Sequence, residues 1–335
     1  MSASTPAAPE LPVARATDLE IASAEHQWLV RQIWTQQAVG IVGGVPKSCK
    51  SWFGLDLAVS VASSTPCLGR FAVDDPGTAL VYLAEAALPL VRGRIADLCL
   101  HRGLSLAELD LLVITAPSLR LDLAADQARL CATVARHEPR LLVLDPLVRL
   151  HRLDENSSAD VSALLGFLRE LSREHKVAIV LVHHMSKRRR ADLGQSLRGS
   201  GDLHAWTDDS AYLTHRHGDG RLVLVTEHRS APASRPVELK LVSRADGSAT
   251  HLEIVGDAPL DDGSAPTPPA APSLTDRILA ALRSAPQALL RAELRETLRT
   301  NNQRLGDALT VLQREGVVEH TDRGWTLGRA RHVGA

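Results

Sequence analysis

The feature that most constrains this chain is the octapeptide GVPKSCKS at residues 44–51. It directly follows an apolar run, AVGIVG at 38–43, and precedes a segment with the apolar periodicity of a helix, at 51–61. This order predicts a phosphate-binding loop between a strand and a helix, because the backbone N–H groups of such a loop and the helix N-terminus hold anions. Cys49 stands where the usual pattern has a glycine, so a surface loop that only resembles this motif is the alternative.

The residue types of this loop predict ATP with Mg²⁺ as the ligand. Lys50 is expected to reach the β and γ phosphates, and the Ser51 hydroxyl to bind Mg²⁺. The residues expected to line the nucleotide site are Gly44, Val45, Pro46, Lys47, Ser48, Cys49, Lys50, Ser51 and Trp52.

Short apolar runs alternate with longer helical patterns over the first two-thirds of the chain. The runs lie at 38–43, 79–84, 111–116, 141–145 and 177–184. This alternation predicts an α/β fold, in which a parallel sheet is covered by helices. After Gly199 the runs SAYLTHR, RLVLVTEHR and VELKLV follow one another closely, so we expect the sheet to end in antiparallel strands.

Two segments are unable to build a core and divide the 335 residues into blocks. Residues 1–15 are rich in Ala, Pro and Ser and are expected to be disordered, and residues 256–272 form a Pro/Ala-rich linker. We therefore expect an ATPase domain at 16–255 and a second domain at 273–330.

The second block has leucines at helical spacing in three short segments, followed by a strand-turn-strand pattern at 318–327. This predicts a small α+β winged helix-turn-helix domain, whose recognition helix begins near Asn301. Its residues 301–304, NNQR, are suited to contacting DNA, but many winged helices bind proteins, and both functions remain open.

Composition excludes several classes of protein. There are 38 Lys and Arg residues against 39 Asp and Glu, so any contact with nucleic acid must be local. One basic run, KRRR at 187–190, is either such a contact or an ordinary solvated segment. The four cysteines have no paired spacing, and we find no apolar stretch of membrane length and no signal-peptide pattern, so we expect a cytoplasmic protein that does not bind membranes.

Two carboxylates are candidates for the chemistry. Asp145 ends the apolar strand at 141–145, which suits a residue that holds Mg²⁺ beside the loop. Glu85 follows the run at 79–84, and it would lie beside the γ-phosphate, as general base, if that strand neighbours the P-loop strand. A solvated glutamate is the alternative.

Two adjacent histidines, His183 and His184, end the strand at 177–184, where doubly wound sheets place their ligands. One of them would sense the γ-phosphate, or both are structural. No cysteine or carboxylate accompanies them at metal-ligand spacing, so we expect no metal site there.

With these residues in place, about residues 25–245 resemble the RepA-type branch of the RecA-like ATPases, which are relatives of the DnaB-type hexameric helicases. The resemblance rests on GVPKSCKSWFGLDLAVSVA, VYLAEA, LLVLDPLVRLHRLDEN, VLVHHMSK, SLRGSGDLHAWTDD and TEHRSAP. It implies Asp145 as the Walker B carboxylate, Glu85 as catalytic base and His184 or His183 as sensor.

The resemblance further implies Arg229 as an arginine finger presented to a neighbouring subunit, with Arg198 as a second candidate near the γ-phosphate. It implies a homo-hexamer that binds single-stranded DNA through the core, including the 187–198 loop, and possible double-stranded DNA contacts through the winged helix. A helicase or translocase in replication of a mobile element is the expected function. The alternatives are an ATP-gated DNA-binding switch, favoured by Cys49 and by Glu227 where many relatives have Lys, and an adaptor with a degenerate pocket.

Overall fold

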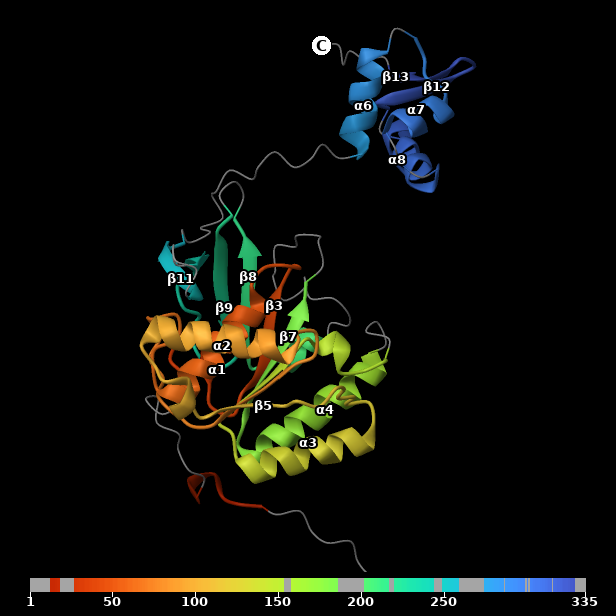
Figure 1. Cartoon of the computed structure of the whole chain (residues 1–335). Coiled ribbons are helices and arrows are strands. Elements are labelled where there is room, and N and C mark those ends of the chain that lie inside the picture. The colour runs from red at the N-terminus through yellow and green to blue at the C-terminus, as the bar shows by residue number, and fades with distance from the viewer. Residues whose placement is uncertain are drawn as a thin grey trace, which may run out of the picture. The chain divides into compact units, whose positions relative to one another are not determined.

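The computed structural model describes residues 13–18, 27–153, 158–185, 202–216, 220–243, 249–258, 274–285, 287–298, 300, 302–314 and 316–328 (Figure 1). The chain separates into two compact units, Met1–Leu260 and Asp261–Ala335. The first unit contains the phosphate-binding loop, and each unit has a hydrophobic core of its own.

Within its described residues, the first unit is built on a nine-stranded sheet with the order β11-β10-β9-β8-β3-β7-β6-β4-β5. Its strands are β3 (Val39–Gly44), β4 (Ala79–Leu83), β5 (Leu111–Val113), β6 (Leu141–Asp145), β7 (Ala178–His184), β8 (Asp209–His215), β9 (Leu222–His228), β10 (Val237–Ser243) and β11 (Thr250–Asp257). Neighbours from β5 to β8 are parallel, and β9, β10 and β11 continue the sheet in antiparallel pairs. The predicted α/β class, including its antiparallel end, is confirmed.

Helices cover both faces of this sheet (Figure 1). α1 (Lys50–Ser63) and α2 (Leu88–Arg102) pack on one face, and α3 (Ala124–His137) and α4 (Ser158–His175) pack on the other. Neighbouring side chains of β3 enter opposite cores: Val42 lies with the α1 and α2 residues, and Ile41 with the α3 and α4 residues. A strand buried on both faces explains the continuous apolar runs in the sequence.

Some element boundaries differ from the sequence prediction. β5 ends at Val113, three residues before the predicted run ends, and β11 was not predicted. β11 also extends through Asp257, into the segment expected to be linker. A short hairpin of β1 (Trp28–Val30) and β2 (Trp34–Thr35) precedes β3, and no helix in the described part of the chain is long and apolar enough to cross a membrane.

The described residues of the second unit form three helices and a two-stranded hairpin. These are α6 (Leu274–Ser284), α7 (Arg291–Leu298), α8 (Asn302–Arg314), β12 (Val318–Thr321) and β13 (Gly324–Leu327). The leucines at helical spacing build its core, with Leu294, Leu305 and Leu309 fully enclosed. The hairpin is joined to the segment before α7 by two backbone hydrogen bonds between Leu289 and Trp325.

Candidate nucleotide-binding site

The phosphate-binding loop connects the carboxyl end of β3 with the first turn of α1. Lys47 and Cys49 have positive φ angles of 66° and 58°, and the Cys49 carbonyl accepts the Phe53 N–H at 3.0 Å. Cys49 is therefore the N-cap of α1 in a left-handed conformation that glycine adopts more readily. The cysteine leaves the loop in place, at the cost that a side chain incurs in this conformation, about 1 kcal/mol.

The polar groups of the loop suit a phosphate ligand. The Lys50 Nζ donates to the Val45 carbonyl at 2.8 Å, so the lysine folds back over its own loop. Burial lowers the pKa of Lys50, whereas the charges of Asp145, Cys49 and Glu85 raise it. The Ser48 hydroxyl is buried and has no hydrogen-bond partner among the described residues. A buried cation and a buried hydroxyl that still lacks a partner fit an anionic group with several acceptor oxygens.

Asp145 ends β6 and lies against the start of α1. The Ser51 hydroxyl hydrogen-bonds its carboxylate, and the aspartate is 7% exposed. Burial raises the pKa of Asp145, and the Ser51 hydrogen bond together with the Lys50 and Arg94 charges opposes this shift. A hydroxyl and a carboxylate held together are oxygen ligands of the kind that Mg²⁺ prefers, so these residues fit the expected ion.

The condition set for Glu85 does not hold, because β4 is not a neighbour of the P-loop strand. β3 pairs with β7, and the strand order places both β7 and β6 between β3 and β4. Glu85 nevertheless follows β4 at the same sheet edge, and its charge acts on both Lys50 and Asp145. Its Oε1 accepts the Arg149 Nε–H at 2.7 Å, and its side chain is 49% exposed.

The two histidines stand beside the loop. In the parallel β3–β7 pair, His183 is opposite Gly43 and His184 is opposite Gly44. His183 is buried and His184 is half-buried. The described residues contain no group of three or more His, Cys, Asp or Glu side chains that could hold a metal ion.

Arg94 is a site residue that the sequence did not reveal. It projects from α2, and its guanidinium lies 5.5 Å from the ring centre of Trp52, the residue after Ser51. Its charge lowers the pKa of both Cys49 and Asp145, against the larger effect of burial. Arg94 belongs to no motif; the only sequence signal is its place next to the buried positions Val91 and Ile95 of an amphipathic helix.

Arg229 lies at the end of the sheet where β3 begins, opposite to the end that carries the phosphate-binding loop. Asp209 pairs with Gly40 near the start of β3 and with His228 at the end of β9, whereas the loop begins after Gly44. The rise along β3 therefore separates Arg229 from the loop of its own chain by roughly 15 Å. Its guanidinium donates to the carbonyls of Ala205 at 2.6 Å and Thr207 at 3.0 Å.

The Cys49 thiol lacks the thiolate character that a helix N-terminus ordinarily favours. Burial raises the pKa of the Cys49 thiol, and the opposing effects of Lys50 and Arg94 are smaller. A helix N-terminus by itself lowers the pKa of a thiol, but this thiol is partly buried against the hydrophobic core.

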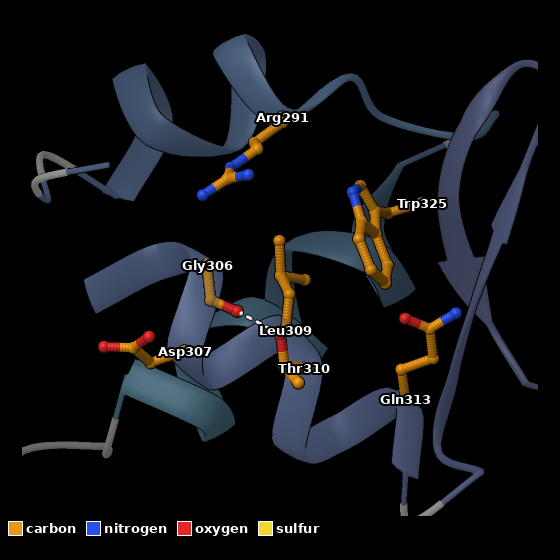
Figure 2. A pocket seen from close by; sticks show the side chains of 7 residues that line it. All are labelled: Arg291, Gly306, Asp307, Leu309, Thr310, Gln313 and Trp325. Carbon is orange, nitrogen blue, oxygen red and sulfur yellow. Dashed lines mark hydrogen bonds between the residues drawn. The ribbon is translucent and has the colours of Figure 1, made fainter. Parts of the chain in front are cut away.

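Several predicted contact residues lie outside the described part of the chain. These are Arg198, the basic run at 187–190 and the whole 187–198 loop, together with Asn301 and the side chains of residues 302–304. In the second unit the described residues do form a pocket of about 420 Å³, lined by Arg291, Gly306, Asp307, Leu309, Thr310, Gln313 and Trp325. Figure 2 shows Arg291 and the Trp325 indole on two sides of it, with Leu309 between them.

One comparison with known proteins shows the family of this chain. A family model described as an AAA domain matches residues 5–190. The chain belongs to the AAA domain family. This AAA domain protein is also similar to a solved structure described as the RadB recombinase, with 18% identity and a TM-score of 0.48 over 67% of this chain and 92% of that one. A search of the curated proteins gives no match. Family membership and a loop suited to phosphate identify a P-loop ATPase.

Proposed function

We propose that this AAA domain protein binds ATP with Mg²⁺, hydrolyses it and acts on DNA as a RecA-like hexamer of the RepA and DnaB type. The observation that carries the proposal is convergence: Lys50 and Ser51 follow β3, Glu85 follows β4 and Asp145 ends β6, yet their charges and hydrogen bonds meet at one sheet edge. Three separate strand ends supply the parts that phosphoryl transfer requires.

Each of these residues has a distinct role in the proposal. Lys50 and the loop N–H groups bind the β and γ phosphates, and Arg94 adds positive charge at the same edge. Ser51 and Asp145 would hold Mg²⁺, which supplies neutralisation of phosphate charge when bound. Glu85 orients a water molecule and accepts its proton, and His184 contacts the γ-phosphate from the neighbouring strand.

Arg229 would complete the site of an adjacent subunit. Its distance from its own loop is inconsistent with a role within one chain, and its side chain is 53% exposed at the far edge. A guanidinium supplied in trans would stabilise the transition-state charge and make hydrolysis depend on assembly. The proposed partners are therefore further copies of this chain, with single-stranded DNA at the core and duplex DNA at a winged helix formed by α6 to β13.

A second function, that of an ATP-gated DNA-binding switch without unwinding, is favoured by one observation. Arg229 is bound within its own chain by two carbonyls and by Asp208 at 3.4 Å, so it must release these contacts before it can reach a neighbour. Such a step would slow hydrolysis. In this version nucleotide state controls assembly and DNA binding only.

ATP turnover with and without single-stranded DNA tests the proposal in wild type, Lys50→Ala, Glu85→Gln and Arg229→Ala. We expect DNA to stimulate the wild type and each substitution to abolish turnover. Strand displacement on a forked duplex then separates motor from switch, because a switch hydrolyses ATP without displacing the strand. No turnover in the wild type under any condition would exclude the ATPase role.

A further inference from the structure

The Glu85–Arg149 ion pair connects the proposed base with the surface beyond the nucleotide site. Arg149 ends the short 3-10 helix η3 (Leu147–Arg149), which begins two residues after Asp145. Its Nε–H donates to the Glu85 Oε1 at 2.7 Å. A carboxylate oxygen that accepts this bond has one site fewer for the hydrogen bond that a general base must offer to water.

Arg149 meets Glu85 in an ion pair that is open to solvent. The Arg149 side chain is 59% exposed. An external ligand can therefore approach its guanidinium from solvent.

The turn that presents Arg149 is fixed by a second arginine. Arg120 donates through Nη1 to the carbonyls of Arg149 at 2.7 Å and His151 at 3.2 Å, and the Leu121 N–H donates to the Leu150 carbonyl at 2.6 Å. These bonds hold the backbone of the turn, so the Arg149 side chain can exchange partners while its backbone stays in place. Two guanidinium groups on neighbouring loops also suit an anionic ligand.

We infer that Arg149 stays paired with the Glu85 carboxylate until a phosphate group of single-stranded nucleic acid replaces the carboxylate as the partner of the arginine. This exchange frees Glu85 to act as the base in hydrolysis. The inference rests on the proposed roles of Glu85 and of DNA and adds the residue through which DNA would stimulate turnover. The exchange costs little, because an exposed ion pair is weak and the arginine gains another anion in return. Arg149 is thus a positioning residue, and by reciprocity removal of Glu85 must strengthen nucleic-acid binding.

The test combines a binding measurement with turnover, in the full-length protein. Affinity for a fluorescent single-stranded oligothymidylate is measured by anisotropy without nucleotide, for wild type, Glu85→Gln, Arg149→Ala and Arg149→Lys. Arg152→Ala is the matched control, since this exposed arginine on the same segment has no contact with Glu85. Binding of a non-hydrolysable ATP analogue is measured in parallel, because ATP phosphates are the other possible source of the displacing group.

We expect Glu85→Gln to tighten oligonucleotide binding by up to about fivefold, the factor that corresponds to about 1 kcal/mol for an exposed pair. Arg149→Ala should weaken oligonucleotide binding, raise DNA-free turnover by up to about fivefold and remove the stimulation of turnover by DNA. Arg149→Lys should keep part of this stimulation. Arg152→Ala should leave DNA-free turnover unchanged.

Two results would overturn the inference alone: unchanged oligonucleotide affinity in Glu85→Gln, or weaker binding of the ATP analogue but not of the oligonucleotide in Arg149→Ala. A fall of DNA-free turnover in Arg149→Ala would also overturn it, because the arginine would then assist the base. Full turnover in Glu85→Gln would instead remove the base assignment of the proposed function, and the inference with it.

Discussion

The Ser51 hydroxyl hydrogen-bonds the Asp145 carboxylate, which joins the first turn of α1 to the end of β6. This contact brings together two residues that are 94 positions apart in the sequence, and it places both expected magnesium ligands beside Lys50. Because Asp145 is almost fully buried, its negative charge destabilises the nucleotide-free fold.

Asp145→Asn should stabilise the nucleotide-free protein and abolish Mg²⁺-dependent nucleotide binding. The pKa of Asp145 is raised by burial above its ordinary value of 3.8, so the protonated form favours folding. Its contribution to stability is present below that value and is lost as the pH rises through the raised pKa. The melting temperature of Asp145→Asn should exceed that of wild type by a few degrees near neutral pH. The gap should narrow as the pH falls toward 4, and a gap independent of pH would contradict this.

Cys49→Gly should stabilise the loop without weakening ATP binding. Glycine adopts the left-handed conformation of residue 49 without the cost of a side chain, about 1 kcal/mol, although the more flexible unfolded chain offsets part of the gain. Chemical denaturation and nucleotide titration of the two proteins check this. Loss of ATP affinity in Cys49→Gly would show that the thiol contributes directly to the site.

Alkylation of Cys49 should be slow at neutral pH. The raised pKa leaves little thiolate, and the reaction should accelerate only as the pH approaches and passes that value. Mass spectrometry of peptide-mapped protein after treatment with iodoacetamide measures the rate at each pH. Rapid modification at pH 7 would contradict the burial of this thiol.

Arg94→Ala should weaken ATP binding by about tenfold. This factor corresponds to about 1.5 kcal/mol, the lower end of the range for the loss of a charge-assisted hydrogen bond. Arg92→Ala is the control, since Arg92 is exposed on the same helix. Isothermal titration with a non-hydrolysable analogue compares the two. Equal affinities for both variants would show that Arg94 serves only to pack against Trp52.

The sequence predicts the parts of this site that are local. Residues 44–51 fold between one strand and one helix, so their order alone indicates the loop, and Asp145 is recognised because it ends an apolar run. The order of the strands depends on pairing between distant segments, which no local pattern encodes. For that reason the sequence gives the neighbourhood of β4 and the P-loop strand only as a condition. The strand order does not meet this condition, although the charge of Glu85 still acts on Lys50 at the same end of the sheet.

Arg94 and Arg149 illustrate the remaining limit. Each takes its role from a contact across the fold, with Trp52 and with Glu85 respectively, and neither stands at a spacing that has chemical meaning in the sequence. Cys49 shows the reverse case, since its place at a helix N-terminus was visible but its burial was not.

The central claim is that one sheet edge binds Mg-ATP and hydrolyses it with Glu85 as base. The most direct test measures ATP affinity and single-turnover hydrolysis in wild type, Lys50→Ala and Glu85→Gln. We predict that Lys50→Ala loses binding, and that Glu85→Gln keeps wild-type affinity while its hydrolysis falls by about 10²-fold or more. Wild-type hydrolysis in Glu85→Gln, or wild-type affinity in Lys50→Ala, would contradict the account.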